Sequence, residues 1–274
     1  MVRKLIKYDF VSFLRLLLPV QLIVIGIAGV NRIVQIFEKG GGPAYSIVFV
    51  SSIVLLSVAC VVALVMCFVI GIVRFYQGLY SKEGYLSHTL PVTAAQHLWS
   101  KLIVTMIFEV GTVFTIFLAV NVATIGDVGV ELYKALGYLL GQAFTYMHGH
   151  LILFIVEGVV MLLVATACSF LRIYFCISIG QLVNRKKILL AFGIYFGLYM
   201  LGQIFATILI ILGMVLANNE PWMHLAESIG NWVVAHPIAS LHTGLIAGTI
   251  VTAVFGLVYF LVSRAIMTRR LNLS

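Results

Sequence analysis

The sequence predicts an all-α, polytopic membrane protein with six transmembrane helices and an N-terminal interfacial helix. The first observation is composition, because 62% of the 274 residues are hydrophobic and only 9% are charged. A soluble domain, by comparison, carries about 25% charged residues. The mean hydropathy of +1.15 is correspondingly high. This excludes a soluble enzyme, a disordered chain and a disulfide scaffold. The second observation is that residues 40–73, 188–219 and 228–263 contain no Asp, Glu, Lys or Arg.

The charge-free stretches are predicted to be helices that cross a bilayer. Each exceeds the about 20 residues that a helix needs to span the hydrocarbon core. Backbone amides in lipid must be hydrogen-bonded within the protein, which allows only helices or a closed β-barrel. Barrel strands would show apolar and polar residues in alternation over segments of about ten residues, whereas these stretches are continuously apolar. The whole chain, residues 1–274, is therefore predicted to be a single transmembrane domain. Its six spans are expected at Leu16–Phe37, Ser46–Val73, Leu102–Ile125, Leu151–Cys176, Ile188–Leu216 and Thr243–Val262.

The segment before the first span and the fourth span each depart from a plain apolar run. Residues 1–15, before the first span, mix four basic residues with apolar ones at roughly helical spacing. This predicts an interfacial helix on the membrane surface, with a simple basic anchor as the alternative. The fourth span is interrupted by Glu157 and Arg172, and its helix is expected to continue towards Val183.

The basic residues predict the orientation of the chain. Fourteen of the 17 Lys and Arg residues fall on one side of the predicted spans, and only Arg32, Lys39 and Lys134 fall on the other. The positive-inside rule therefore places both termini in the cytoplasm. The net charge of +8 is explained by basic loops against an anionic lipid surface. A nucleic-acid partner is not expected, because no soluble basic domain is present to bind it.

Several catalytic motifs are missing. The sequence has no GxxxxGK[ST] phosphate loop, no HExxH and no GxSxG, so it is not predicted to be an enzyme and has no ATP site of its own. Its energy source is expected in another chain or in an ion gradient. The five histidines on the outer side fit no metal-ligand spacing, so no metal site and no cofactor are predicted. They are His148, His150, His224, His236 and His242.

The connection between the second and third spans, Arg74–Lys101, is the longest cytoplasmic segment. Aromatic residues are mixed there with charged residues and histidines. This composition fits a protein-contact surface and aromatic residues placed at the lipid headgroups equally well. A short helix about Lys82–Thr89 is expected before Pro91, and Thr93 is expected to cap the helix that enters the third span.

This connection also resembles that of a known family. The stretch GYLSHTLPVTAAQHLWSKL is similar to the "EGYL…TLPV" pattern of bacterial ABC type-2 permeases, the membrane subunits of ATP-binding cassette exporters. The segments KYDFVSFLRLLLPVQL and SIGQLVNRKKILL resemble the family's start and its fourth-to-fifth span connection. The resemblance implies an ABC type-2 exporter-like fold in the bacterial cytoplasmic membrane. It also implies a separate ATPase subunit that holds ATP and Mg, and a second permease subunit, the same or related.

The resemblance further implies roles for particular segments. In this family the loop after the second span carries a coupling helix that docks on the ATPase. A re-entrant segment is expected outside at residues 218–242, and the substrate is expected to be hydrophobic or amphipathic, such as an antimicrobial peptide. The residues that would meet the ATPase are Lys82, Glu83, Gly84, Tyr85, Leu86, His88, Leu90 and Pro91.

Four polar residues within or beside the spans are candidates for the substrate path: Glu109, Glu157, Asn31 and Gln203. Charged groups in lipid cost at least about 2.5 kcal/mol on insertion scales, so they usually face a cavity or a partner. For each glutamate the alternative is a helix-to-helix hydrogen bond. The alternative function is a proton-coupled secondary transporter that uses Glu109 and Glu157.

Two pairs of glycines have the spacing that lets helices approach closely, either within the chain or at a seam with a second subunit. They are Gly193 with Gly197 and Gly244 with Gly248.

Overall fold

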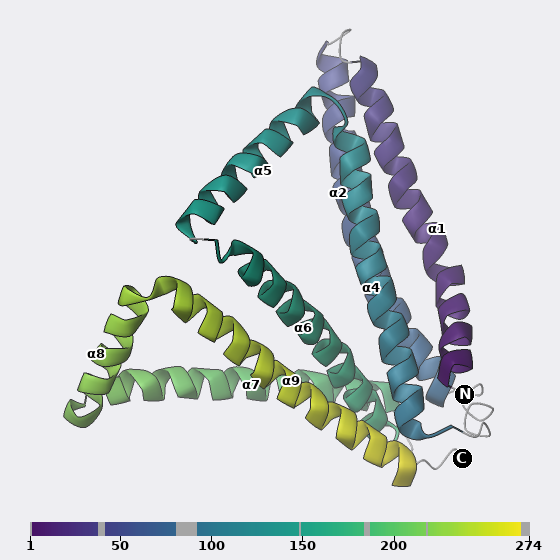
Figure 1. Ribbon diagram of the computed structural model, residues 1–274. Helices are drawn as coiled ribbons and strands as arrows, with labels where there is room; N and C mark the ends of the chain where they lie inside the picture. Colours follow the sequence, from purple (N-terminus) through teal and green to yellow (C-terminus); the bar gives the residue numbers. More distant parts are fainter. Residues whose placement is uncertain are drawn as a thin grey trace. The chain divides into compact units, whose positions relative to one another are not determined.

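The computed structural model is helical throughout the part of the chain that it describes (Figure 1). The described residues are 2–37, 42–80, 92–147, 149–183, 187–217 and 219–269. The helices are α1 (Val2–Ile36), α2 (Pro43–Tyr80), α4 (Ala94–Thr124), α5 (Asp127–Tyr146), α6 (Leu151–Gly180), α7 (Lys187–Ala217), α8 (Glu220–Ala235) and α9 (Pro237–Arg269).

The predicted helical class is confirmed, as is the presence of six apolar helices that can span a membrane. Among the described residues, α1, α2, α4, α6, α7 and α9 are long and apolar enough to cross a bilayer. Most run beyond the predicted spans, and α6 continues past Cys176 to Gly180. These ends continue as helix because helical hydrogen bonding does not stop where the hydrocarbon core stops.

The chain forms two compact units, residues 1–146 and 147–274. The first contains α1, α2, α4 and α5, and the second contains α6, α7, α8 and α9. The sequence predicted one transmembrane domain over residues 1–274 and contained no signal for a boundary within it. Each unit is described below by itself.

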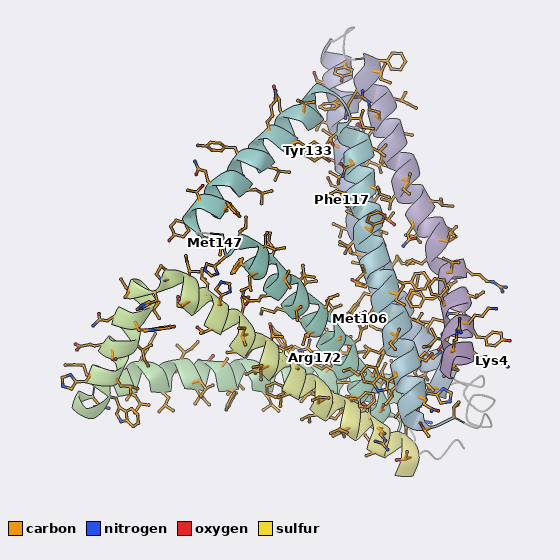
Figure 2. The ribbon with its side chains drawn as sticks, viewed as in Figure 1. Lys4, Met106, Phe117, Tyr133, Met147 and Arg172 are labelled. Atoms are coloured by element: carbon orange, nitrogen blue, oxygen red, sulfur yellow. The ribbon has the colours of Figure 1, made fainter. Side chains whose placement is uncertain are left out.

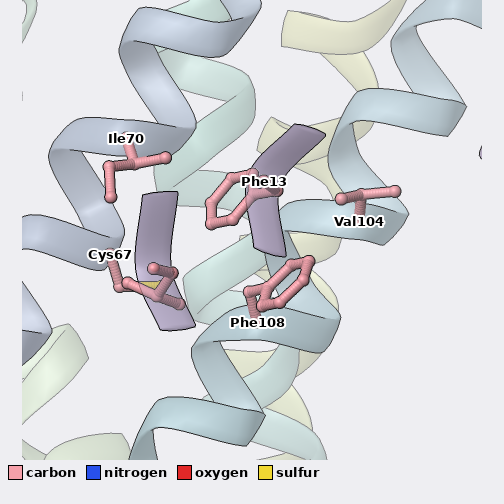
Figure 3. Close-up of a cluster of buried hydrophobic side chains, with 6 residues drawn as sticks. Phe13, Cys67, Ile70, Val104 and Phe108 are labelled. Carbon is pink, nitrogen blue, oxygen red and sulfur yellow. The ribbon is translucent and has the colours of Figure 1, made fainter. Parts of the chain in front are cut away.

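In the first unit, α1, α2 and α4 pack against one another. A buried cluster joins all three near the start of α1, and Phe13 stacks on Phe108 with ring centroids 4.6 Å apart (Figure 3). Towards the other end of α1 the buried cluster consists mainly of alanines, whose small side chains let the helices approach closely. The first cluster is Phe13, Leu17, Cys67, Ile70, Val104 and Phe108, and the second is Val24, Ala28, Leu56, Ala63, Ala119 and Ala123.

In the second unit, α6 and α9 form the most extensive helix pair. A methyl group added at Gly256 in α9 would lie 3.7 Å from Cβ of Cys168 and 3.7 Å from Cδ1 of Leu171, both in α6. The helix α7 contacts α6 and α8, and none of its described residues is buried within the chain. Its surface is therefore available to lipid or to another protein.

The start of α1 differs in form from the separate interfacial helix expected at residues 1–15. The structure continues one helix from Val2 to Ile36, with Pro19 inside it. Proline is tolerated in membrane helices because neighbouring helices and local adjustments satisfy the freed backbone group. The basic residues of the expected interfacial segment are thus the first turns of α1.

The third span begins as predicted. Thr93 is the N-cap of α4: its Oγ1 accepts a hydrogen bond from the backbone N–H of Gln96 at 3.4 Å, and Oε1 of Gln96 accepts one from the backbone N–H of Thr93 at 2.9 Å. This reciprocal capping box satisfies two donors that the helix end would otherwise leave unpaired. The expected short helix at about Lys82–Thr89 lies outside the described residues.

Two shorter helices lie between the apolar ones. The sequence-based prediction had no element at α5, whereas α8 lies inside the segment 218–242 that was expected to be re-entrant. Almost all described side chains of α5 are exposed within the chain, among them Tyr133 (Figure 2). Gly126 connects α4 to α5 with φ at 119°, a conformation that other residues rarely adopt.

Candidate functional site

The residues expected to contact an ATPase subunit, Lys82 to Pro91, lie outside the described residues. Their flanks are described. The helix α2 ends at Tyr80, and α4 begins at Ala94 behind the Thr93 cap. The segment between them therefore connects two long helices that both pack against α1.

Asn31 is the most buried of the four substrate-path candidates, with 1% of its surface exposed. Its Nδ2 donates to Oγ of Ser52 in α2 at 3.0 Å, and its Oδ1 accepts from Nε2 of Gln35 at 2.8 Å. Gln35 also donates to the carbonyl oxygen of Ala123 in α4 at 2.6 Å. These bonds tie α1, α2 and α4 together, so the polar atoms of Asn31 are occupied by packing partners within the chain.

Glu109 lies half-buried in α4 and faces α2, where the Cys67 thiol lies beside its carboxyl group. Its Oε2 is buried and has no hydrogen-bond partner among the described residues. One turn further along α4, Thr112 accepts a hydrogen bond from Gln21 of α1 at 3.3 Å. Glu109 is therefore the candidate that keeps unused hydrogen-bonding capacity inside an apolar helix.

Glu157 makes a helix-to-helix hydrogen bond, the alternative that the sequence left open for it. Its Oε2 lies 2.6 Å from Nδ1 of His242 in α9, and the two side chains are 18% and 14% exposed. The rings of His150 and Phe154 lie beside His242, at centroid distances of 5.8 Å and 6.2 Å. Nε2 of His242 is buried and unpartnered within the described residues. In that same part of the chain, no three His, Cys, Asp or Glu side chains are grouped as a metal would require.

Gln203 differs from the other candidates because it is exposed within the second unit. Its amide donates to the hydroxyl oxygen of Tyr199, one turn away on the same helix, at 3.2 Å. It therefore joins no other helix of the described chain. Among the described residues, no two of the four candidates share a hydrogen-bond partner.

A polar contact in the second unit was not predicted from the sequence. Arg172 of α6 donates from Nη2 to the hydroxyl oxygen of Tyr195 in α7 at 3.0 Å, and its guanidinium carbon lies 4.9 Å from the ring centroid of Tyr195 (Figure 2 labels Arg172). The sequence identified Arg172 only as an interruption of an apolar span. Nothing in the local pattern around Tyr195 marks it as the partner, because the pairing depends on how α6 and α7 pack.

A second unpredicted group lies in the first unit, where α1 and α4 begin and α2 ends. The carboxylate of Asp9 pairs with Lys101 and also accepts a hydrogen bond from Oγ of Ser100 at 2.6 Å. Arg74 of α2 donates from Nη2 to the carbonyl oxygen of Ser12 at 3.3 Å. Asp9 is an acidic residue in an otherwise basic segment, which is the sequence signal that points to this pair.

No model of a protein family, no curated protein and no solved structure matches the chain.

Proposed function

We propose that this chain is the permease subunit of an ATP-driven exporter of the ABC type-2 kind. Two such subunits would form the path for a hydrophobic or amphipathic substrate such as an antimicrobial peptide. A separate ATPase subunit would bind ATP and Mg and would drive the path between two states through the connection between α2 and α4.

The observation that carries the proposal is the combination of six apolar helices with no phosphate loop and with the family-like segment GYLSHTLPV. These 274 residues contain no phosphate loop and include six long apolar helices, so ATP-driven work by them would use a separate ATPase subunit. The flanks of the segment support a mechanical role. Both α2 and α4 pack on α1, so a displacement of the segment would be passed to the whole three-helix group.

The test is to disrupt the proposed docking segment and to measure the attached ATPase. The tagged chain is purified from its native membranes, and vanadate-sensitive ATP hydrolysis in the eluate is measured. Tyr85→Asp and Leu86→Asp each place a charge in a contact expected to be apolar, so the co-purified activity should fall by about tenfold or more. The matched control is Leu182→Asp, at an exposed leucine of the other predicted cytoplasmic connection.

Two results would overturn the proposal. The first is equal ATPase recovery with Leu86→Asp and with the unmodified chain. The second is substrate transport by the purified chain in liposomes that contain no nucleotide hydrolase.

The alternative is a proton-coupled secondary transporter, and the Glu157–His242 pair is the observation that favours it. Titratable pairs within apolar helices are typical of proton pathways. The two functions differ in their energy source. In reconstituted vesicles that contain the chain together with its co-purified partners, ATP without a pH gradient drives the exporter, whereas a pH gradient without ATP drives the secondary transporter.

A further inference from the structure

The first unit contains a cavity of about 310 Å³, lined by both apolar and polar residues, at the end where α1 and α4 begin and α2 ends. This volume lies at the lower end of the range of about 300–1,000 Å³ found for ligand pockets. The buried cluster of Figure 3 closes one side of it, because Phe13 and Val104 belong to both. The polar side chains that line the cavity are Tyr8, Asp9, Ser12, Arg74, Lys101 and Thr105.

The charges of the cavity are not balanced. Its only carboxylate among the described lining residues, Asp9, is paired with Lys101 and accepts a further bond from Ser100. Arg74 has no carboxylate partner among the described residues, and its Nη2 donates a hydrogen bond to the carbonyl oxygen of Ser12 at 3.3 Å. Its Nε is buried and has no hydrogen-bond partner in the described part of the chain. The cavity therefore carries one positive charge that the described chain does not neutralise.

An anion with several oxygen atoms would remove this imbalance. A buried N–H of a charged group that lacks a partner is costly, and the planar guanidinium fork matches phosphate oxygens in geometry. The Tyr8 and Ser12 hydroxyl groups at the same wall are further donors. A phosphate group fits both the charge and the size of the space.

The surroundings of the cavity indicate that this phosphate is carried by a lipid. Three exposed basic residues, Arg3, Lys4 and Lys7, occupy the first turns of α1. Tyr8 and Trp99 are 74% and 48% exposed at this end, and such aromatic residues mark the headgroup level of a bilayer. Further along α1 the exposed side chains are apolar, among them Leu16, Leu18 and Leu22. A lipid seated here would place its phosphate in the cavity and its acyl chains against this apolar surface.

We propose that the cavity between the starts of α1 and α4 and the end of α2 binds the phosphate group of an anionic phospholipid. Arg74 is the principal donor, and Asp9 is a positioning residue that holds Lys101 at the wall. The site is a structural lipid site of the first unit and does not depend on the function proposed above.

The experiment measures lipid binding to the purified full-length chain by native mass spectrometry in detergent. The probes are phosphatidylglycerol, diacylglycerol with the same acyl chains, and inorganic phosphate. Phosphatidylglycerol should be retained and diacylglycerol should not. Arg74→Gln should weaken phosphatidylglycerol binding by about tenfold or more, because a charge-assisted hydrogen bond is lost. The matched control is Arg15→Gln, at an exposed arginine of α1 that does not line the cavity, and it should change the affinity by less than about twofold.

A second variant tests the cavity independently, in case Arg74→Gln lowers lipid binding by misfolding. Ser12→Leu occupies cavity space and keeps both cations, so it should also weaken phosphatidylglycerol binding. Equal losses with Arg74→Gln and Arg15→Gln would overturn the site in favour of diffuse attraction to basic residues. Inorganic phosphate that displaces phosphatidylglycerol at equal concentration would identify a soluble anion site instead, and unchanged binding in Ser12→Leu would exclude the cavity.

Discussion

The structural role of Glu157 depends on a hydrogen-bond partner that lies far away in the sequence. It stands near the start of α6, and its partner His242 stands near the start of α9, 85 positions later. The sequence marked Glu157 because a carboxylate within an apolar run needs a partner or a cavity. It marked His242 only as one of several outer histidines. A role of Glu157 in the substrate path stays a prediction, and its contact with His242 supports a packing role.

The pair predicts a measurable coupling. In a double-mutant cycle of Glu157→Ala and His242→Ala, the free energies of unfolding in SDS should show a coupling of about 0.5–2 kcal/mol, the range of hydrogen bonds between membrane helices. The reason is that each single variant leaves the other polar group unpaired inside the second unit.

The control for that cycle combines Glu157→Ala with His224→Ala, because His224 lies on α8 and is exposed. This second cycle should give a coupling near zero. Equal coupling in both cycles would mean that the 2.6 Å contact does not contribute to stability.

At the scale of elements, glycine positions distinguish tight packing within the chain from open helix surfaces. In α9, Gly256 faces Cys168 and Leu171 of α6, and Gly248 faces Met161, whose Cε would lie 3.6 Å from an added methyl group. In α7, a methyl group added at Gly193 or Gly197 would meet no heavy atom of the described chain within 4 Å. Of the two spaced glycine pairs in the sequence, one therefore contributes Gly248 to the α6–α9 contact, and the other stays available for a seam between subunits.

This difference predicts opposite effects of the same substitution. Gly256→Leu should destabilise the chain by about 1–3 kcal/mol, because the larger side chain must displace α6. Gly193→Leu should leave stability unchanged, since no atom of the described residues lies within 4 Å of the added methyl position. Thermal unfolding of both variants in detergent measures the difference, and equal losses would contradict the packing of α6 against α9.

Helix ends could be predicted from the sequence more readily than short helices outside the apolar spans. The sequence predicts Thr93 as a cap because a hydroxyl oxygen just before a helix can accept a hydrogen bond from a backbone N–H of its first turn. The capping box with Gln96 confirms this prediction. The helix α5 was not predicted, because its residues neither form a continuous apolar run nor bury one face in the described chain. The mixed apolar and polar pattern of such a helix is a weaker sequence signal than the continuous apolar run of a transmembrane helix.

At the scale of the whole molecule, the structure has the two-unit division and the six apolar helices, and the orientation remains a prediction from charge. Within the first unit the polar contacts agree with helices α1, α2 and α4 that alternate in direction. Asp9 near the start of α1 meets Lys101 near the start of α4, and Arg74 near the end of α2 reaches Ser12. This alternation is what three successive membrane crossings require.

The orientation predicts which engineered cysteines a membrane-impermeant maleimide can reach in intact cells. Tyr133→Cys and His224→Cys should be labelled, because they lie on the predicted outer side. Lys4→Cys and Leu182→Cys should be labelled only after permeabilisation, because the basic side is held in the cytoplasm.

The unmodified chain is the control for this labelling. Its four cysteines, Cys60, Cys67, Cys168 and Cys176, all lie inside apolar helices and should not react. Labelling of Lys4→Cys in intact cells would reverse the topology and remove the proposed ATPase contact from the cytoplasm.

The amino-acid sequence by itself determined the helical class, the number of apolar helices, the Thr93 cap and the positions that carry charge within spans. These properties are local, because a run of apolar residues in lipid must satisfy its backbone internally whatever surrounds it. Only the tertiary structure decided that Asn31 joins three helices, that Glu157 meets His242, and that Arg74 lines a cavity without a carboxylate partner among the described residues. These pairings depend on the rotation of each helix about its axis, which is set by the packing of side chains far apart in the chain.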